Sequence, residues 1–345
     1  MGSKKYNRQI AFLQVWAIVL VCLGHSLFNP YATIYIHRWI YAFHMPLFMF
    51  LSGYLLVYAC NIKNREVRDI EWFGRERFLL KKAKRLLLPY FFISTLVYVP
   101  KCLLSAYALR PVDLSFGAYI QMLLYPWDNV IKFFWFLPTL FIITLLTVGL
   151  IKVFRIRREN MFAYGIIFVV LLLLKVFNPL EGVSFLNLEG VIGYWLFFWC
   201  GFVFFFIQGN IERRLYLEKE WMCALLGIVF SGLIYYFPDA SAPLVRAGYT
   251  FLGILFSLSL SKLYVRYHAR WADHLFGSSY AIYLFSWFPL VAVQFIVQKA
   301  GLSWQLGLVI ALSVQIYIPF LFYKLILKIK QRGTWGKRIA ALLGQ

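Results

Sequence analysis

Residues Arg8 to Ser26 read RQIAFLQVWAIVLVCLGHS, and residues Trp39 to Leu56 read WIYAFHMPLFMFLSGYLL. Each stretch is close to the roughly 20 mostly apolar residues that a helix needs to cross the hydrocarbon core of a bilayer. Neither contains a carboxylate, and each carries one histidine. Both stretches therefore predict membrane-spanning helices, each with one ionisable group inside it.

The composition of the whole chain also predicts that its surroundings are a lipid bilayer. The chain has 345 residues, of which 62% are hydrophobic and only 14% are charged, whereas about a quarter of a soluble globular chain is charged. Its formal net charge of +21 is a property of many nucleic-acid-binding proteins. Here, however, the basic residues lie in short clusters between apolar runs, which is typical of membrane topology. We expect a membrane protein with lipid contacts and no nucleic-acid partner.

Ten apolar segments are candidates for membrane spans, and the predicted fold is an all-α integral membrane protein. The first follows Lys4, Lys5 and Arg8 but has no small-residue cleavage site, so it is interpreted as a retained span and not as a signal peptide. The candidates are 10–28, 39–59, 86–104, 133–153, 161–177, 190–207, 221–237, 247–263, 276–298 and 305–327.

The distribution of basic residues predicts the orientation of these spans. With the N-terminus in the cytoplasm, 28 of the 35 Lys and Arg residues fall in the inner segments and seven in the outer ones. Cytoplasmic connections carry such an excess of positive charge, so both termini are expected to be cytoplasmic. The hydrophilic connections are too short for a soluble domain, and residues 1–345 are interpreted as one membrane domain.

The cysteines and histidines give no sign of a metal site or a disulfide framework. The five cysteines are scattered through apolar runs without a CxxC pair, and the five histidines include no HExxH pattern. No metal is therefore expected.

His25 and His44 are the candidate catalytic residues. Ionisable groups inside spans are costly and mark functional sites, and the two histidines fall at similar depth on consecutive spans that run in opposite directions. Gln14 precedes His25 by eleven residues, which places it within roughly 20° of the same helix face and about 16 Å away along the axis. Pro46 frees the carbonyl of Ala42. The alternative is that each histidine is a hydrogen-bonded core residue and that Pro46 only bends a helix.

The stretches LVCLGHS and FHMPLFMFLSGYLL resemble those of the acyltransferase family 3 membrane proteins, in particular the fucose 4-O-acetylase-like and exopolysaccharide O-acetyltransferase subgroup. Three further stretches are similar to family segments, namely KRLLLPYFF (Lys84 to Phe92), FWFLPTLF (Phe134 to Phe141) and SSYAIYLFSWFP (Ser278 to Pro289). The resemblance covers most of the chain, and the family's ten-helix core agrees with the count above. It also implies the cell membrane of a bacterium as the location.

The resemblance implies transfer of an acyl group, usually acetyl from acetyl-CoA, to a hydroxyl of a cell-surface glycan or lipid-linked sugar. It places catalysis at His25. No cofactor would be held permanently, since acetyl-CoA is the acyl donor. The sequence departs from the family at three positions: Gln14 stands where a basic residue is frequent, Ala11 where an Asp is frequent, and Ser286 where a histidine is common. These departures bear on how the donor is bound.

Three basic residues are candidates for the phosphates of CoA. Arg77, Lys81 and Arg85 recur every four residues, and they would form one stripe on a helix that enters the third span from the cytoplasm. Arg and Lys recognise phosphate well. The alternative is that positive-inside topology and anionic lipid headgroups alone explain this charge. Gln14 is a further candidate for contact with the donor, lower in the same channel as His25.

The partner that would orient the base is left open by the sequence. The candidate carboxylates lie in predicted outer connections, and they are Asp113, Asp128, Glu181 and Glu189. Trp135, Trp195 and Trp199 have rings that can stack on sugars, but aromatic residues near span ends more often anchor a protein at the membrane interface.

Two other classes of function remain as alternatives. A transporter for a glycolipid would also be polytopic and basic on the inner side, although such proteins often show internal repeats, which this sequence lacks. A non-catalytic scaffold for polysaccharide assembly is the second alternative. The acceptor sugar, the membrane face that meets it and the oligomeric state are not predicted.

Overall fold

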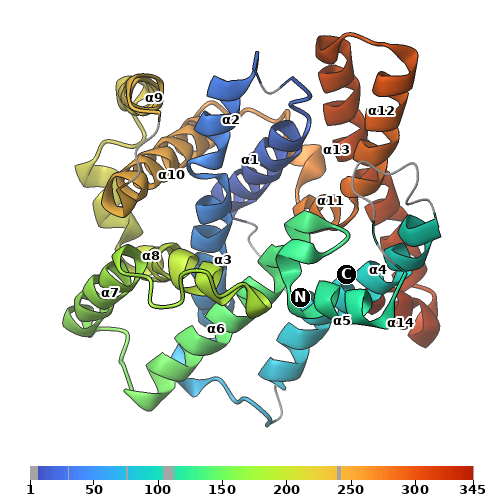
Figure 1. Cartoon of the computed structure of the whole chain (residues 1–345). Coiled ribbons are helices and arrows are strands. Elements are labelled where there is room, and N and C mark those ends of the chain that lie inside the picture. The colour runs from blue at the N-terminus through green and yellow to red at the C-terminus, as the bar shows by residue number, and fades with distance from the viewer. Residues whose placement is uncertain are drawn as a thin grey trace. The chain divides into compact units, whose positions relative to one another are not determined.

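The structure is a computed structural model of the chain, and it describes residues 7–29, 31–74, 77–103, 112, 114–238 and 242–344. All regular secondary structure in these residues is helical (Figure 1). The all-α prediction is therefore confirmed for the described part of the chain.

The part of the chain that the structure describes contains fourteen α-helices with the following bounds: α1 Arg8–His25, α2 Ile34–Tyr41, α3 His44–Asn61, α4 Phe78–Leu103, α5 Phe116–Leu124, α6 Phe136–Val153, α7 Met161–Val176, α8 Leu188–Arg214, α9 Glu220–Tyr236, α10 Pro243–Arg266, α11 Ser279–Phe285, α12 Trp287–Ala300, α13 Trp304–Lys330 and α14 Gly333–Leu342. Short 3₁₀ helices lie between them: η1 Val67–Asp69, η3 Pro126–Asp128, η4 Lys132–Trp135, η5 Phe185–Asn187 and η6 Asp273–Leu275.

Seven helical segments among the described residues are long and apolar enough to cross a membrane. They become eight if α11 and α12, which meet at an angle of 49°, form one broken span. The two remaining predicted spans, 161–177 and 221–237, coincide with the shorter apolar helices α7 and α9. The count of ten and the orientation of the termini therefore stay predictions.

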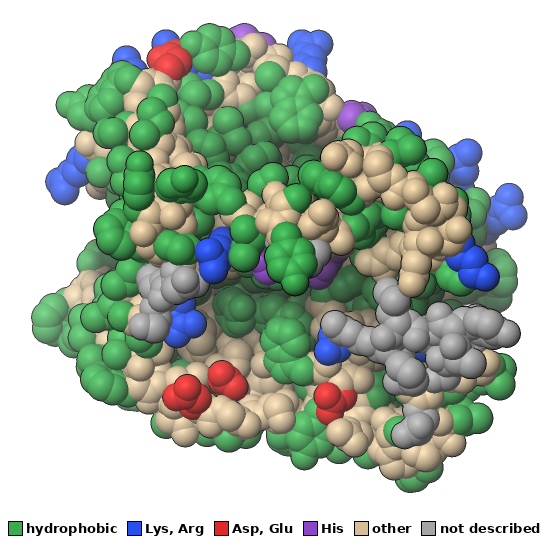
Figure 2. Space-filling view, turned by 45° about the horizontal axis from the view of Figure 1, so that its top comes forward, with side chains coloured by type: hydrophobic (Ala, Val, Ile, Leu, Met, Phe, Trp, Pro, Cys, Tyr) green, Lys and Arg blue, Asp and Glu red, His purple; other side chains and the backbone are tan. Residues whose placement is uncertain are grey.

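The surfaces of α7 and α9 are unusually apolar for helices of a soluble protein. On α7, Val169 and Leu173 are each 52% exposed, and on α9, Ile228 is 71% exposed. Figure 2 shows hydrophobic side chains over much of the face it presents, with Lys and Arg side chains standing apart from one another. Exposed apolar areas of this kind mark contact with lipid or protein, which favours a membrane environment.

The chain divides into two compact units. Unit 1 comprises residues 1–54 and 201–323, and unit 2 comprises residues 55–200 and 324–345. The chain passes from one unit to the other within α3, α8 and α13. The prediction of a single domain stays a prediction.

The core of unit 1 is built around α1. This helix is apolar on every side, and most of its residues are buried, including Leu13, Val15 and Ile18; a helix that is apolar all round belongs in a core or a membrane. It packs against α2, α10 and α11, while α9 packs on α10 and α2. The side chains of α1 are thereby held from several directions.

Unit 2 is organised by α4 and α6, which pack against each other. The C-terminal helix α14 lies against α4, and the 3₁₀ helix η1 lies against α6. The Lys152 ammonium at the end of α6 donates to the Ile70 carbonyl at 2.6 Å, so it satisfies a backbone acceptor that directly follows η1.

Candidate functional site

The two candidate catalytic histidines lie at helix ends in unit 1. His25 is the last residue of α1, and His44 is the first residue of α3. His25 is half-buried, and His44 is only 3% exposed. A third residue, Tyr41, contacts both rings, and the catalytic role of the two histidines stays a prediction.

Tyr41 stands between the histidines. Its ring centroid lies 6.4 Å from that of His25 and 4.8 Å from that of His44, with both rings edge-on to it. On its other contact, Tyr41 stacks against His37 with a centroid distance of 3.9 Å and an interplanar angle of 17°. We call these four residues the histidine cluster.

A glycine allows Tyr41 to approach α1. A Cβ atom at Gly24 would come within 3.1 Å of Cε2 of Tyr41, which is tighter than side chains normally pack. Gly24, the residue before His25, therefore leaves the space that the Tyr41 ring occupies. This close packing holds the ring beside His25.

The break between α2 and α3 places His44 at a helix start. Pro46 is the third residue of α3, and it cannot donate the hydrogen bond that the Ala42 carbonyl would receive in a continuous helix. The Thr250 hydroxyl of α10 donates to that carbonyl at 2.7 Å. The acceptor that Pro46 frees is thus bound by a neighbouring helix.

The tautomer of the neutral His44 ring follows from its contact with the backbone. Nδ1 of His44 lies 2.9 Å from the Ile40 carbonyl oxygen. Because a carbonyl can only accept, Nδ1 donates in this contact, and the neutral ring keeps Nε2 as its proton acceptor. His44 is therefore oriented, with one nitrogen available for chemistry.

The end of α1 is fixed by a buried polar group from α13. The Gln315 amide, 1% exposed, donates to the Ser26 hydroxyl at 2.6 Å, and Ser26 donates to the Cys22 carbonyl at 2.8 Å. Ser286, which stands where the resemblance to the family implies a histidine, is buried near the Cys22 side chain. That family position therefore lies beside α1, one turn before His25.

Gln14 lies on the same continuous helix as His25. It is half-buried, between the buried residues Leu13 and Val15. Because α1 is unbroken from Arg8 to His25, the expected separation of about 16 Å along the axis holds.

The basic stripe expected at Arg77, Lys81 and Arg85 is shorter than the spacing suggested. Lys81 and Arg85 are exposed one turn apart on α4, but Arg77 precedes the helix and has a left-handed backbone with φ 46°. The helix begins at Phe78, so Arg77 does not continue the helical stripe. Whether these residues bind the donor stays a prediction.

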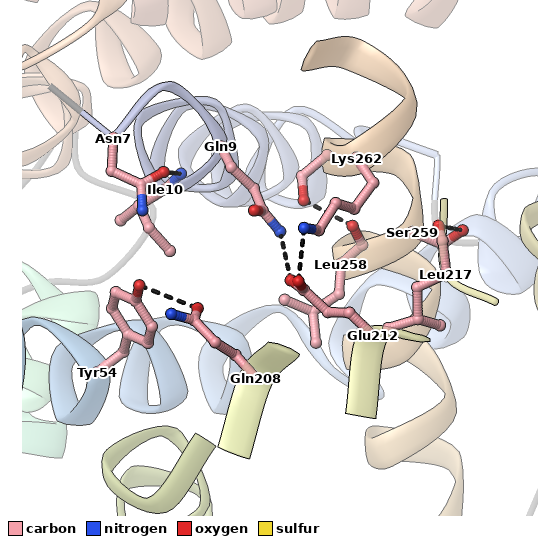
Figure 3. A network of polar contacts seen from close by, with 11 residues as sticks. Asn7, Gln9, Ile10, Tyr54, Gln208, Glu212, Leu217, Leu258, Ser259 and Lys262 are labelled. Carbon is pink, nitrogen blue, oxygen red and sulfur yellow. Dashed lines mark hydrogen bonds and ion pairs between the residues drawn. The ribbon is translucent and has the colours of Figure 1, made fainter. Parts of the chain in front are cut away.

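A polar network ties together three helices at the other end of α1. Gln9 of α1 donates to the Glu212 carboxylate of α8 at 3.1 Å, and Lys262 of α10 forms an ion pair with the same carboxylate at 2.5 Å. Figure 3 shows Gln9 and Lys262 pointing toward Glu212 from two sides, with the Tyr54–Gln208 hydrogen bond nearby. Sequence reasoning missed this network, since its members are far apart in the chain.

A pocket of about 420 Å³ opens beside the network and is lined by Gln9, Glu218, Lys219, Lys262, Val265 and Arg266. Three of these residues are cations. Arg266 is also paired with the Glu220 carboxylate at 3.1 Å, as Lys262 is with Glu212. The pocket therefore combines basic and acidic groups at the end of α1 that is remote from His25.

A second set of charged contacts fastens the start of α1 to η6. The Arg8 guanidinium donates to the Asp273 carboxylate at 2.8 Å and to the Ala269 carbonyl at 2.6 Å, and the Tyr264 hydroxyl donates to Asp273 at 2.6 Å. Burial raises the pKa of the Asp273 carboxyl. The hydrogen bonds from Tyr264 and Arg8 and the charges of Arg8 and Arg270 outweigh burial and hold that pKa below its ordinary value.

The candidate carboxylates have separate surroundings. Asp128 accepts a hydrogen bond from Gln121 at 2.9 Å, Glu189 accepts one from the Gly182 backbone at 3.2 Å, and Glu181 is exposed. Asp113 lies outside the described residues. Asp128, Glu181 and Glu189 all belong to unit 2, whereas the histidine cluster belongs to unit 1. Among the described residues, no three His, Cys, Asp or Glu side chains are grouped to hold a metal ion.

His37 and Tyr41 are the members of the cluster that sequence reasoning missed. Their spacing could have found them, because residues 37, 41 and 44 recur at four and three positions and so share one face of a helix. The signal is weak in a chain in which 20% of the residues are aromatic.

Comparison with known proteins identifies the family. No curated protein and no solved structure matches this chain. The model of the acyltransferase domain that defines acyltransferase family 3 matches residues 7–324, which is nearly the whole chain and includes every member of the histidine cluster. The chain therefore belongs to acyltransferase family 3 and is a multi-pass membrane acyltransferase.

Proposed function

We propose that this protein is an O-acetyltransferase of the exopolysaccharide type, which moves an acetyl group from acetyl-CoA to a hydroxyl of a cell-surface glycan or lipid-linked sugar. The observation that carries the proposal is the histidine cluster. Within the matched acyltransferase domain, a histidine of α1 and a histidine of α3 contact one tyrosine ring. A non-catalytic scaffold has no need of such a group.

In the proposed reaction, His25 acts as the general base. Its imidazole takes the proton of the acceptor hydroxyl while the hydroxyl oxygen attacks the thioester carbonyl of acetyl-CoA. The carbon–sulfur bond then breaks, the ester forms, and the CoA thiolate takes the proton from the imidazolium. Imidazole suits both steps, since its ordinary pKa of about 6.5 lies near neutrality.

His44 has a supporting role in this proposal. Its Nδ1 is bound to the Ile40 carbonyl, so the other nitrogen of the neutral ring would accept a hydrogen bond from a hydroxyl of the acceptor. It would bind the acyl carbonyl only when the ring is protonated. Tyr41 holds the two histidine rings in a fixed relation. Gln14 would donate a hydrogen bond to the donor, about 16 Å along the helix from His25.

The phosphates of CoA require cations on the inner side of the membrane. The proposed ligands are Lys81 and Arg85 of α4, together with Arg77 just before it. The pocket at the start of α1, with Lys219, Lys262 and Arg266, is a second candidate for these phosphates. The KM for acetyl-CoA distinguishes the two candidate sites. It should rise when Gln replaces Lys81 and Arg85 if the phosphates bind there, and when Gln replaces Lys219 and Lys262 if they bind in the pocket.

The experiment that tests the function follows labelled acetyl. Membranes that contain the wild type or the His25→Ala variant at equal amounts are incubated with radiolabelled acetyl-CoA and glycan fractions. Label that enters a glycan fraction only with the wild type is the expected result. If neither protein transfers label to any acceptor fraction, the transporter or scaffold alternatives are favoured. If His25→Ala keeps full activity, the assignment of the base is wrong.

A further inference from the structure

Three aromatic rings form a continuous stack in unit 2. The rings of Trp127 and Trp135 lie 5.2 Å apart at an interplanar angle of 20°, and those of Trp135 and Tyr194 lie 5.1 Å apart at 24°. The residues come from η3, η4 and α8. Trp135 belongs to the FWFLPTLF segment, whose role the histidine cluster does not explain.

The outermost ring of the stack is held by a buried hydrogen-bond chain. Nε1 of Trp127 donates to the side-chain oxygen of Asn187 at 2.8 Å, and the Asn187 amide donates to the Thr139 hydroxyl at 2.7 Å. Thr139 in turn donates to the carbonyl of Trp135 at 2.7 Å. Asn187 is only 2% exposed, so the orientation of the Trp127 ring is set from inside the protein.

The local backbone holds Asn187 in position for its hydrogen bond with Trp127. Leu186 and Asn187 both adopt left-handed conformations, with φ of 48° and 55°, which are costly for leucine but tolerated by asparagine. A Cβ atom at Gly190 would come within 2.3 Å of the Asn187 side-chain nitrogen. One unfavourable backbone conformation and one closely packed glycine therefore accompany the placement of this asparagine.

The exposed part of Trp127 is apolar ring. The side chain is 45% exposed, whereas Trp135 beneath it is 5% exposed. A tryptophan that anchors a protein at the membrane interface keeps its N–H for the wet side. Here the N–H points inward to Asn187, so a partner meets carbon and not a hydrogen-bond donor.

Two exposed polar residues that can bind sugar hydroxyls lie near Trp127 in the chain. Asp128 follows Trp127 in the chain and is exposed, and the Gln121 amide of α5 donates to its carboxylate at 2.9 Å. A carboxylate and an amide beside an aromatic ring can bind hydroxyl groups while the ring packs against the C–H face of a pyranose. These residues lie in a connection that the charge pattern predicts to be outside.

We infer that Trp127 is a binding platform for a pyranose ring of the acceptor, with Asp128 and Gln121 as hydrogen-bonding partners for its hydroxyls. That the bound sugar is the acceptor rests on the proposed function, but the binding of a sugar does not. The pre-set ring orientation lowers the entropy lost on binding.

Saturation-transfer NMR on the purified protein in nanodiscs tests this inference directly. The probes are methyl glycosides of glucose, galactose, N-acetylglucosamine, fucose and rhamnose. We expect saturation transfer to the C–H protons of at least one glycoside, and affinity roughly tenfold lower in Trp127→Ala. The matched control is Trp221→Ala, which removes a comparably exposed tryptophan, 55% exposed on α9, and should bind as the wild type does.

Two further variants keep the test informative if Trp127→Ala folds poorly. Trp127→Tyr keeps a ring and should retain binding, whereas Asn187→Ala keeps the indole but releases its N–H and should weaken binding. Absence of saturation transfer to every glycoside in the wild type, or equal losses in the Trp127 and Trp221 variants, would overturn the inference. Acetyl transfer by the same preparations is measured separately. A failure of sugar binding at Trp127 is therefore distinguishable from a failure of the proposed acetyltransferase activity.

Discussion

Tyr41 is the residue that joins the members of the histidine cluster. If its ring positions His25, Tyr41→Ala should lower kcat about tenfold or more, because small displacements of a catalytic group are costly, and should leave the KM for acetyl-CoA unchanged. Tyr41→Phe keeps the ring and should have nearly wild-type kcat. Steady-state kinetics on purified protein measures both constants. Equal loss in the two variants would show that the hydroxyl, and not the ring, is needed.

Asp273 gives a prediction about pH. Its pKa is lower in the folded protein than in the unfolded chain, so the contact with Arg8 and Tyr264 stabilises the fold above the unfolded pKa of about 3.9. That contribution is lost as the pH falls through the still lower folded pKa. Asp273→Asn should therefore unfold more easily at pH 7, by about 0.5–1 kcal/mol since the pair is partly exposed. The difference should vanish in strong acid.

Thermal unfolding in detergent at pH 7 and at the lowest pH that the folded protein tolerates checks this expectation. A difference between wild type and Asp273→Asn that stays constant with pH would mean that the lost stability comes from packing. The charge of the carboxylate would then have no part in it.

At the residue level, the sequence predicts less of the site than of the fold. His25 and His44 could be found because an ionisable residue is conspicuous inside an apolar span. Tyr41 has only the weak signal of its spacing from His37 and His44, which is hard to recognise among many aromatic residues. The Glu212–Lys262 pair depends on where two helices meet, and no local pattern encodes that. The spacing of Arg77 fits a helix, but its backbone is left-handed and α4 begins only after it, at Phe78.

At the level of elements, the break between α2 and α3 can be tested as a coupled pair. Thr250→Val should cost about 1–3 kcal/mol, because the Ala42 carbonyl loses its donor. In a Pro46→Ala background, the new backbone N–H can bind that carbonyl, so the same Thr250 change should cost less. A double-mutant cycle on apparent unfolding temperatures measures this coupling. Additive effects would mean that the Ala42 carbonyl depends on Thr250 to the same extent with or without Pro46.

The contact between α3 and α8 depends on one glycine. A Cβ atom at Gly201 would lie 1.8 Å from the backbone oxygen of Phe50, and a backbone atom cannot move aside as a side chain can. We expect Gly201→Ala to destabilise the protein by about 1–3 kcal/mol or more. Gly209→Ala on the same helix meets nothing within 4 Å and should be neutral or slightly stabilising, as alanine favours helix.

Heating each variant and measuring the fraction that stays monodisperse by size-exclusion chromatography ranks their stabilities. Equal behaviour of the Gly201 and Gly209 variants would contradict the close approach of α8 to Phe50. The sequence identifies neither glycine as special. Only the packing of two helices distinguishes them, which is why spans could be predicted and helix contacts could not.

At the scale of the whole molecule, composition and charge predict the most. Apolar runs of about 20 residues locate the helices because backbone groups in a bilayer must be bonded within the segment. Two of the predicted spans form only the short helices α7 and α9, of 16 and 17 residues, so length alone leaves them undecided. Their exposed apolar surfaces favour lipid contact, and the 28-to-7 division of basic residues holds when both cross.

Cysteine labelling decides whether α7 and α9 cross the membrane. In a background without the five native cysteines, single cysteines replace Arg155, Glu181, Arg214 and Lys299, and intact cells are treated with a membrane-impermeant maleimide. If all ten segments span, Glu181→Cys and Lys299→Cys react in intact cells, while Arg155→Cys and Arg214→Cys react only after permeabilisation. If α7 does not cross the membrane, positions 155 and 181 react on the same side, and the segments between α7 and α9 have the opposite orientation. Beyond α9, the orientation stays inverted if α9 crosses and returns to the predicted one if α9 does not. The charge pattern predicts against that outcome, because it would carry Arg213, Arg214 and Lys219 across the membrane, against the bias that sets topology.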